Sequence, residues 1–117
     1  MTRRTDLAKL TTLAALVLDE RLQHLRQAAE ARKRSVAQLA ALNVTPVELD
    51  LAVPVAERVG LTYERWADLR RAELNAVIAR QTVDLMAERT AASLAFGRSQ
   101  ALRALIDRQP LERPREP

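Results

Sequence analysis

The sequence contains no cysteine, one histidine, two glycines and three aromatic residues among its 117 residues. Without cysteine there can be no disulfide, no thiol nucleophile and no cysteine-ligated zinc site. A lone imidazole cannot build a histidine metal site or a conventional proton relay, so we interpret His24 as structural. Two glycines are too few for a phosphate-binding loop, and both the P-loop and the dinucleotide-binding motifs are missing. We therefore expect a protein that is not an enzyme and that uses no cofactor or metal.

Long apolar runs are missing as well. The longest run, Leu13–Leu18, is far short of the ~20 residues needed to span a bilayer. Asp19 and Glu20 follow it at once, whereas a signal peptide needs a longer apolar region and a small-residue cleavage site. We expect a cytoplasmic protein that does not insert into a membrane.

What the chain does contain is typical of long helices and coiled coils. Hydrophobic residues make up 48% and charged residues 29%, but aromatic residues only 3%, so the core must be built from Ala, Leu and Val. The net charge is +4 and most basic residues are arginines. This balance allows nucleic-acid or acidic partners, but acids are scattered among the bases and no known nucleic-acid-binding motif is present. We expect only electrostatic attraction to nucleic acid.

The prolines divide the chain into two long helical stretches. None occurs from Thr2 to Thr45 or from Val55 to Gln109, whereas Pro46 and Pro54 lie between these stretches. Thr45-Pro46-Val47-Glu48 matches a helix-capping box, and Pro54 suits the first turn of a helix. We predict helices over about 5–42 and 55–108, a turn over about 43–54 and a frayed tail over 109–117. A short connection favours an all-α, antiparallel two-helix coiled-coil hairpin that forms one domain, 1–117.

Both helices show apolar residues at steps of three and four. The predicted seam of the first helix is interrupted only by Arg32 and consists of Ala15, Leu18, Leu22, Leu25, Ala29, Val36 and Leu39. A second, offset stripe upstream consists of Leu7, Leu10, Ala14 and Val17.

The second helix has two apolar rows, and Gly60 and Gly97 weaken it without ending it. One row is Leu74, Ile78, Leu85, Ala92, Ala95, Leu102 and Ile106, and the other is Val83, Met86, Thr90, Leu94, Gly97, Ala101 and Leu105. Either the first helix covers both rows by drifting across them, or part of this surface is reserved for another chain.

The expected register follows from equal rise along both helices. If the second helix starts level with the end of the first, facing residues have numbers that add to roughly 100–108. Leu39 then faces Tyr63–Trp66, Leu25 lies near Val77–Val83, and Leu18 lies near Leu85. In this register the second helix extends past the first near the termini, which leaves Leu102, Leu105 and Ile106 uncovered. We predict that a partner binds through these three residues and through Leu94 of the second row.

Tyr63 and Trp66 lie one helical turn apart beside the predicted connection, next to Arg70 and Arg71. They can pack over the end of the hairpin, or they can anchor a partner, because Trp, Tyr and Arg dominate interface hot spots. These four residues complete the set of candidate partner-binding residues.

The segments RLQHLRQAAEARKRSVAQLAAL (21–42) and WADLRRAELNAVIARQTVDLMAERTAASLAFGRSQALRALIDR (66–108) resemble the two helices of the FliJ/YscO family of type III export proteins. The resemblance covers about residues 5–108. It implies a small stalk protein that engages the hexameric export ATPase and contacts the export gate and export chaperones. On this reading Leu7–Val17 and Leu94–Ile106 face the ATPase ring. Two alternatives stay open: a generic coiled-coil scaffold or dimer, and a basic nucleic-acid-binding helical protein.

Overall fold

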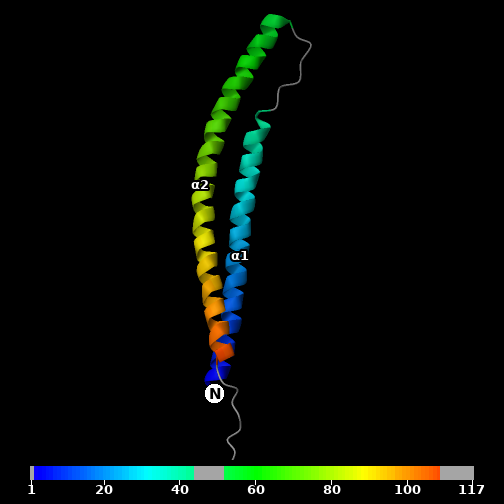
Figure 1. Ribbon diagram of the computed structural model, residues 1–117. Coiled ribbons are helices and arrows are strands. Elements are labelled where there is room, and N and C mark those ends of the chain that lie inside the picture. The colour runs from blue at the N-terminus through cyan, green and yellow to red at the C-terminus, as the bar shows by residue number, and fades with distance from the viewer. Residues whose placement is uncertain (1, 44–51, 109–117) are drawn as a thin grey trace, which may run out of the picture. The chain divides into compact units, whose positions relative to one another are not determined.

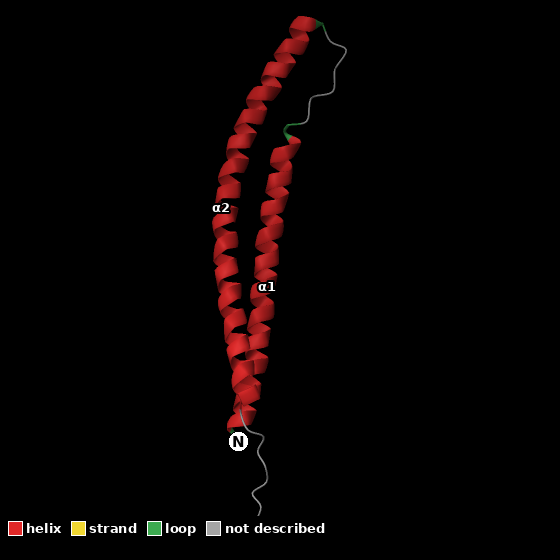
Figure 2. Ribbon diagram, viewed as in Figure 1, coloured by secondary structure: helices red, strands yellow, loops and turns green. Residues whose placement is uncertain are grey.

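The computed structural model describes residues 2–43 and 52–108, and these form two long helices. Helix α1 spans Arg3–Ala41 and helix α2 spans Val53–Arg108 (Figure 1). The helices pack against each other, and the described residues include no strand (Figure 2). The predicted all-α helical hairpin is therefore confirmed, with helix ends within two residues of the predicted ones. The predicted capping box at 45–48 and the tail at 109–117 lie outside the described residues.

The helix starts follow from local chemistry. The Thr2 hydroxyl oxygen accepts a hydrogen bond from the Thr5 amide (3.3 Å), which satisfies one amide that has no intrahelical partner. Pro54 lies in the first turn of α2, where its missing N–H removes no helical hydrogen bond. The amides of Val55 and Ala56 both donate to the Ala52 carbonyl at 2.9 Å, so α2 is hydrogen-bonded from its first turn.

Helix α2 continues through both of its glycines. A Cβ added at Gly60 or Gly97 would meet nothing within 4 Å, and neither residue has a positive φ. Neither glycine is therefore required by backbone conformation or by close packing within this chain.

Gly97→Ala should raise the free energy of unfolding by about 1 kcal/mol, because alanine restricts the unfolded chain and favours the helix. Urea unfolding followed by circular dichroism at 222 nm measures the change. A loss of stability would contradict the open surroundings of this residue.

The described residues of the paired helices form two compact units, which we call unit 1 (residues 2–27 and 86–108) and unit 2 (residues 28–43 and 52–85). In unit 1 the half-buried leucines Leu18, Leu22 and Leu25 of α1 line one groove with the buried Ala92 of α2. Ala95 and Ser99 of α2 are buried as well. In unit 2 the buried residues are Ser35, Leu42, Ala67 and Leu74. The inner row predicted for α2 is confirmed at Leu74, Ala92 and Ala95.

The predicted register is wrong in both units. In unit 2 the Arg32 Nε donates to the Thr82 hydroxyl at 2.9 Å, whereas the predicted register placed residues 68–76 opposite Arg32. In unit 1 Leu18 and Leu25 line one groove with Ala92 and Phe96, instead of lying near Leu85 and Val77–Val83.

The cause lies at the connection end of unit 2. The Leu42 carbonyl accepts hydrogen bonds from Tyr63 and Arg71, so the part of α2 before Tyr63 extends beyond the end of α1 (Figure 1). The prediction assumed that both helices end at the same level there. In unit 2 the overhang of α2 is therefore at the connection. In unit 1 Leu10 lines one groove with Ala101 and Leu102, so α1 reaches this part of α2 and the predicted overhang near the termini is wrong.

The seam of α1 also drifts more than predicted. Ala29 and Val36 are exposed, while Ala28 and Ser35 turn inward. Arg32 is half-buried and bonded to Thr82, so it belongs to the seam and does not interrupt it. A nearly straight helix has 3.6 residues per turn, and its inner face moves away from a strict seven-residue row.

Candidate protein-interaction surfaces

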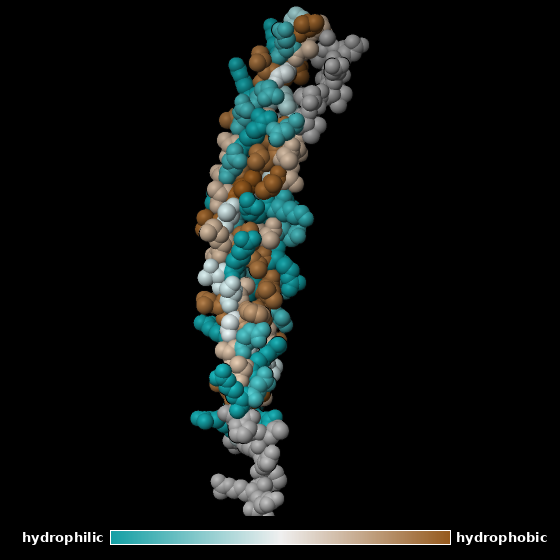
Figure 3. Space-filling model, viewed as in Figure 1, coloured by the Kyte–Doolittle hydropathy of each residue, from teal (hydrophilic) through white to brown (hydrophobic). Residues whose placement is uncertain are grey.

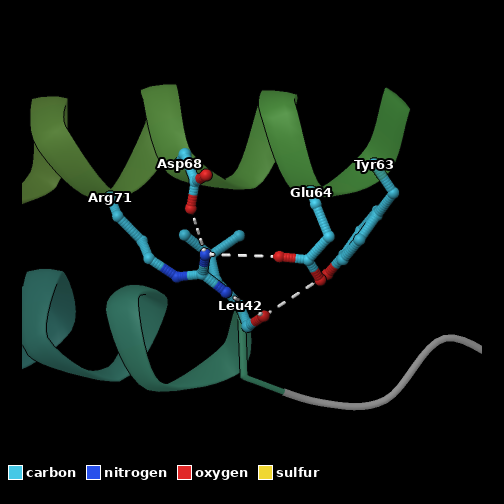
Figure 4. Close-up of polar contacts among 5 residues, drawn as sticks. All are labelled: Leu42, Tyr63, Glu64, Asp68 and Arg71. Carbon is cyan, nitrogen blue, oxygen red and sulfur yellow. Dashed lines mark hydrogen bonds and ion pairs between the residues drawn. The ribbon is translucent and has the colours of Figure 1, made fainter. Parts of the chain in front are cut away.

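The connection end of unit 2 is organised around Arg71 (Figure 4). Its Nη1 lies 2.8 Å from an Asp68 carboxylate oxygen and 3.8 Å from a Glu64 carboxylate oxygen. Its Nη2 donates to the Leu42 carbonyl at 3.3 Å, and the Tyr63 hydroxyl donates to the same oxygen at 3.5 Å. The last carbonyls of a helix have no intrahelical partner, so α2 caps the end of α1 through these side chains.

Trp66 lies beside this cap and is 54% exposed. Its ring is tilted by 43° against that of Tyr63, with 5.8 Å between the ring centres. A shallow hollow next to the two rings is also lined by Arg58, Val59 and Thr62.

Of the four candidate residues at this end, Tyr63 and Arg71 therefore serve the packing of the hairpin. Arg70 pairs with Glu73 at 3.1 Å, which leaves Trp66 as the exposed apolar side chain.

Arg71→Lys should lower the free energy of unfolding by about 1 kcal/mol. A lysine ammonium cannot reproduce the forked geometry that lets Arg71 bind Asp68 and the Leu42 carbonyl together. Urea unfolding measures the loss. Arg70→Lys is the matched control, because the polar contact of Arg70 at this end is with Glu73, three residues later in the same helix. This substitution should change the free energy of unfolding by less than about 0.5 kcal/mol. Equal losses from both variants would contradict the capping role.

In unit 1 the second apolar row of α2 is exposed to solvent. Met86 is 61% exposed, Leu94 56% and Leu105 48%, and Thr90, Gly97 and Ala101 of the same row are also exposed. The alternative in which the first helix covers both rows of α2 by drifting across them is therefore wrong. The row is a surface that α1 leaves free.

A groove beside this row is lined by both helices of unit 1. Its lining residues are Leu10, Leu13, Ala14 and Val17 of α1 with Ala95, Arg98, Ala101 and Leu102 of α2. Leu102 and Ile106 are half-buried, so the expectation that they lack cover is wrong. Leu94 and Leu105 remain accessible as predicted. The exposed leucines of α1 were not named individually as candidates, although the resemblance implied the segment 7–17 as a whole and the sequence showed the offset stripe that contains Leu10 and Val17.

The balance between core and surface is unusual for a protein that acts alone. Within the described residues only five hydrophobic residues are buried, and three of them are alanines. Sixteen large hydrophobic residues are exposed, and Figure 3 shows apolar side chains among polar ones on the visible face. Singly scattered apolar residues are normal on a protein surface, so it is the exposed row of α2 and the groove beside it that point to protein–protein contact.

The part of the chain that the structure describes contains no group of three or more His, Asp or Glu side chains placed to hold a metal ion. Neither described helix has a stretch long and apolar enough to cross a membrane. Comparison with protein-family models, curated proteins and solved structures finds no match to this chain.

Proposed function

We propose that this protein is a non-enzymatic coiled-coil interaction protein that offers the apolar surface of unit 1 to a protein partner. The observation that carries the proposal is the exposed second row of α2, with Met86, Leu94 and Leu105 each about half exposed or more. Burying apolar area gives roughly 25 cal/mol per Å², so a partner that covers this row would gain substantial affinity. The buried hydrophobic residues of unit 1 are both alanines, so such a partner would also add stability to unit 1.

We further propose that the partner is the ATPase of a type III export system, for which the chain serves as a stalk. This identity rests on the resemblance to the FliJ/YscO family. Unit 1 holds both segments that the resemblance implies against the ATPase ring, 7–17 and 94–106. Charge adds support, because the described residues of unit 1 include nine basic and five acidic residues, whereas those of unit 2 include eight basic and six acidic ones. A basic surface speeds association with an acidic partner.

Fluorescence anisotropy of the labelled chain with the purified export ATPase tests the proposal. We expect saturable binding at about 0.15 M salt, because burial of apolar surface is little affected by screening. Duplex DNA is the competing ligand. Its binding should vanish near the same ionic strength, because affinity from phosphate neutralisation falls steeply with salt.

Failure to bind the ATPase would remove the stalk proposal. Sequence-selective duplex binding that persists at about 0.2 M salt would favour the nucleic-acid alternative instead.

A further inference from the structure

Helix α1 carries an exposed stripe in unit 1 whose charge pattern is self-complementary. Leu10, Leu13 and Val17 form its centre and are 48%, 57% and 38% exposed. Asp6 lies four residues before Leu10 and Arg21 four residues after Val17, and both are exposed. The steps of four, three, four and four residues keep the five side chains on one side of the helix.

Neither charged end of this stripe has an ion-pair partner within the described residues. The described ion pairs involve Glu20 with His24 in unit 1 and the arginines of the connection end in unit 2. Among the described residues, nothing therefore occupies Asp6 or Arg21 in an ion pair, and both can face charges on another chain.

The stripe is self-complementary about its midpoint between residues 13 and 14, because positions 10 and 17 are both apolar and positions 6 and 21 carry opposite charges. If an identical helix lies antiparallel across it, Leu10 faces Val17 of the partner subunit and Asp6 faces Arg21 of the partner subunit. A twofold axis repeats each contact, which gives two leucine–valine contacts and two opposite-charge pairs. A parallel arrangement would instead place equal charges opposite each other.

We propose that a second copy of this chain docks antiparallel on the stripe formed by Asp6, Leu10, Leu13, Val17 and Arg21. The apolar groove beside the stripe, which reaches Ala101 and Leu102 of α2, widens the area that the second copy can cover. The next positions outward, Arg3 and His24, bring no opposite charges together, so the contact ends at Asp6 and Arg21. This inference goes beyond the proposed function, because it concerns self-association and does not require an export partner.

Charge reversal tests the pairing. Asp6→Arg and Arg21→Asp should each weaken self-association on the order of tenfold, because each variant turns two attractive contacts of the dimer into two repulsive ones. An equimolar mixture of the two variants should recover wild-type association, because both contacts between unlike chains become attractive again. Sedimentation equilibrium measures all three samples. Loss of folding cannot explain a recovery on mixing.

Disulfide trapping tests the direction of the helices against a background without cysteine. Leu10→Cys and Val17→Cys, mixed and air-oxidised, should cross-link with each other faster than either variant cross-links with itself, because disulfides form only between close Cβ atoms. Preferential linkage of like with like would overturn the antiparallel arrangement.

Two further results would overturn the inference: a wild-type chain that stays monomeric at every concentration measured, or single charge reversals that associate as wild type does. If the chain is monomeric but binds the export ATPase, the self-association inference fails and the proposed function stands. If the mixture recovers association but no ATPase binds, the proposed function fails and this inference stands.

Discussion

Leu74→Ala should lower the free energy of unfolding by about 2–4 kcal/mol, the range expected when a buried leucine is cut to alanine. Leu74 is 3% exposed and is the one large side chain among the buried α2 residues of unit 2, where the other is Ala67. Because the core of unit 2 is so small, there are few neighbouring side chains that could move in to fill the space left by the leucine.

Leu69→Ala is the matched control for this prediction. Leu69 lies five residues earlier in the same helix and is 69% exposed, so the same substitution should change the free energy of unfolding by less than about 0.5 kcal/mol. Urea unfolding of both variants, followed by circular dichroism at 222 nm, gives the comparison. Similar losses at the two positions would contradict the placement of Leu74 in the seam and of Leu69 outside it.

Leu94→Glu combined with Leu105→Glu should weaken binding of the export ATPase by about a hundredfold or more. Each substitution places a charge where we propose an apolar contact, and interface hot spots lose about 2 kcal/mol or more on truncation alone. Both leucines are half exposed in the free chain, and glutamate is a good helix former, so the helix content should not change. Anisotropy titration and circular dichroism of the same samples measure both quantities.

Leu69→Glu controls for the effect of adding a carboxylate to an exposed leucine position of α2, and it should bind the ATPase as wild type does. Equal binding by the Leu94/Leu105 variant would reject the second row as the contact and turn attention to Trp66 at the connection end. Leu102 and Ile106 are less suitable for this test. Both are half-buried, so a glutamate there would disturb the hairpin itself and confuse loss of folding with loss of binding.

The fold was predictable because its strongest signals are local. Proline-free stretches and regular apolar spacing predicted both helices to within two residues of their ends, and Pro54 correctly indicated where α2 begins. The inner row of α2 was predicted correctly at Leu74, Ala92 and Ala95, since apolar residues at helical spacing face the long helix packed against them.

The register could not be predicted in the same way. Apolar residues recur about every seven positions, so sliding one helix by a heptad still matches leucine to leucine or alanine. What selects the register is a small number of specific contacts, such as Arg32 with Thr82 and Arg71 with the Leu42 carbonyl. The capping role of Tyr63 and Arg71 depends on this register, and the sequence alone could only place them near the connection.

The candidate surface was predicted in part. The second row of α2 is visible as a pattern, but whether α1 covers it depends on how the two helices are rotated. The structure resolves that question by leaving Met86, Leu94 and Leu105 exposed. Leu102 and Ile106 were misplaced because their exposure followed from the wrong register.

Hydrogen exchange of the full chain, with and without the purified export ATPase, tests most directly whether the apolar surface of unit 1 is the binding surface. A partner that covers this surface stabilises the local helix, so exchange should slow in residues 86–108 and stay unchanged in residues 58–71. Protection confined to residues 58–71, or no protection at saturating ATPase, would contradict the claim that the apolar surface of unit 1 is the binding surface.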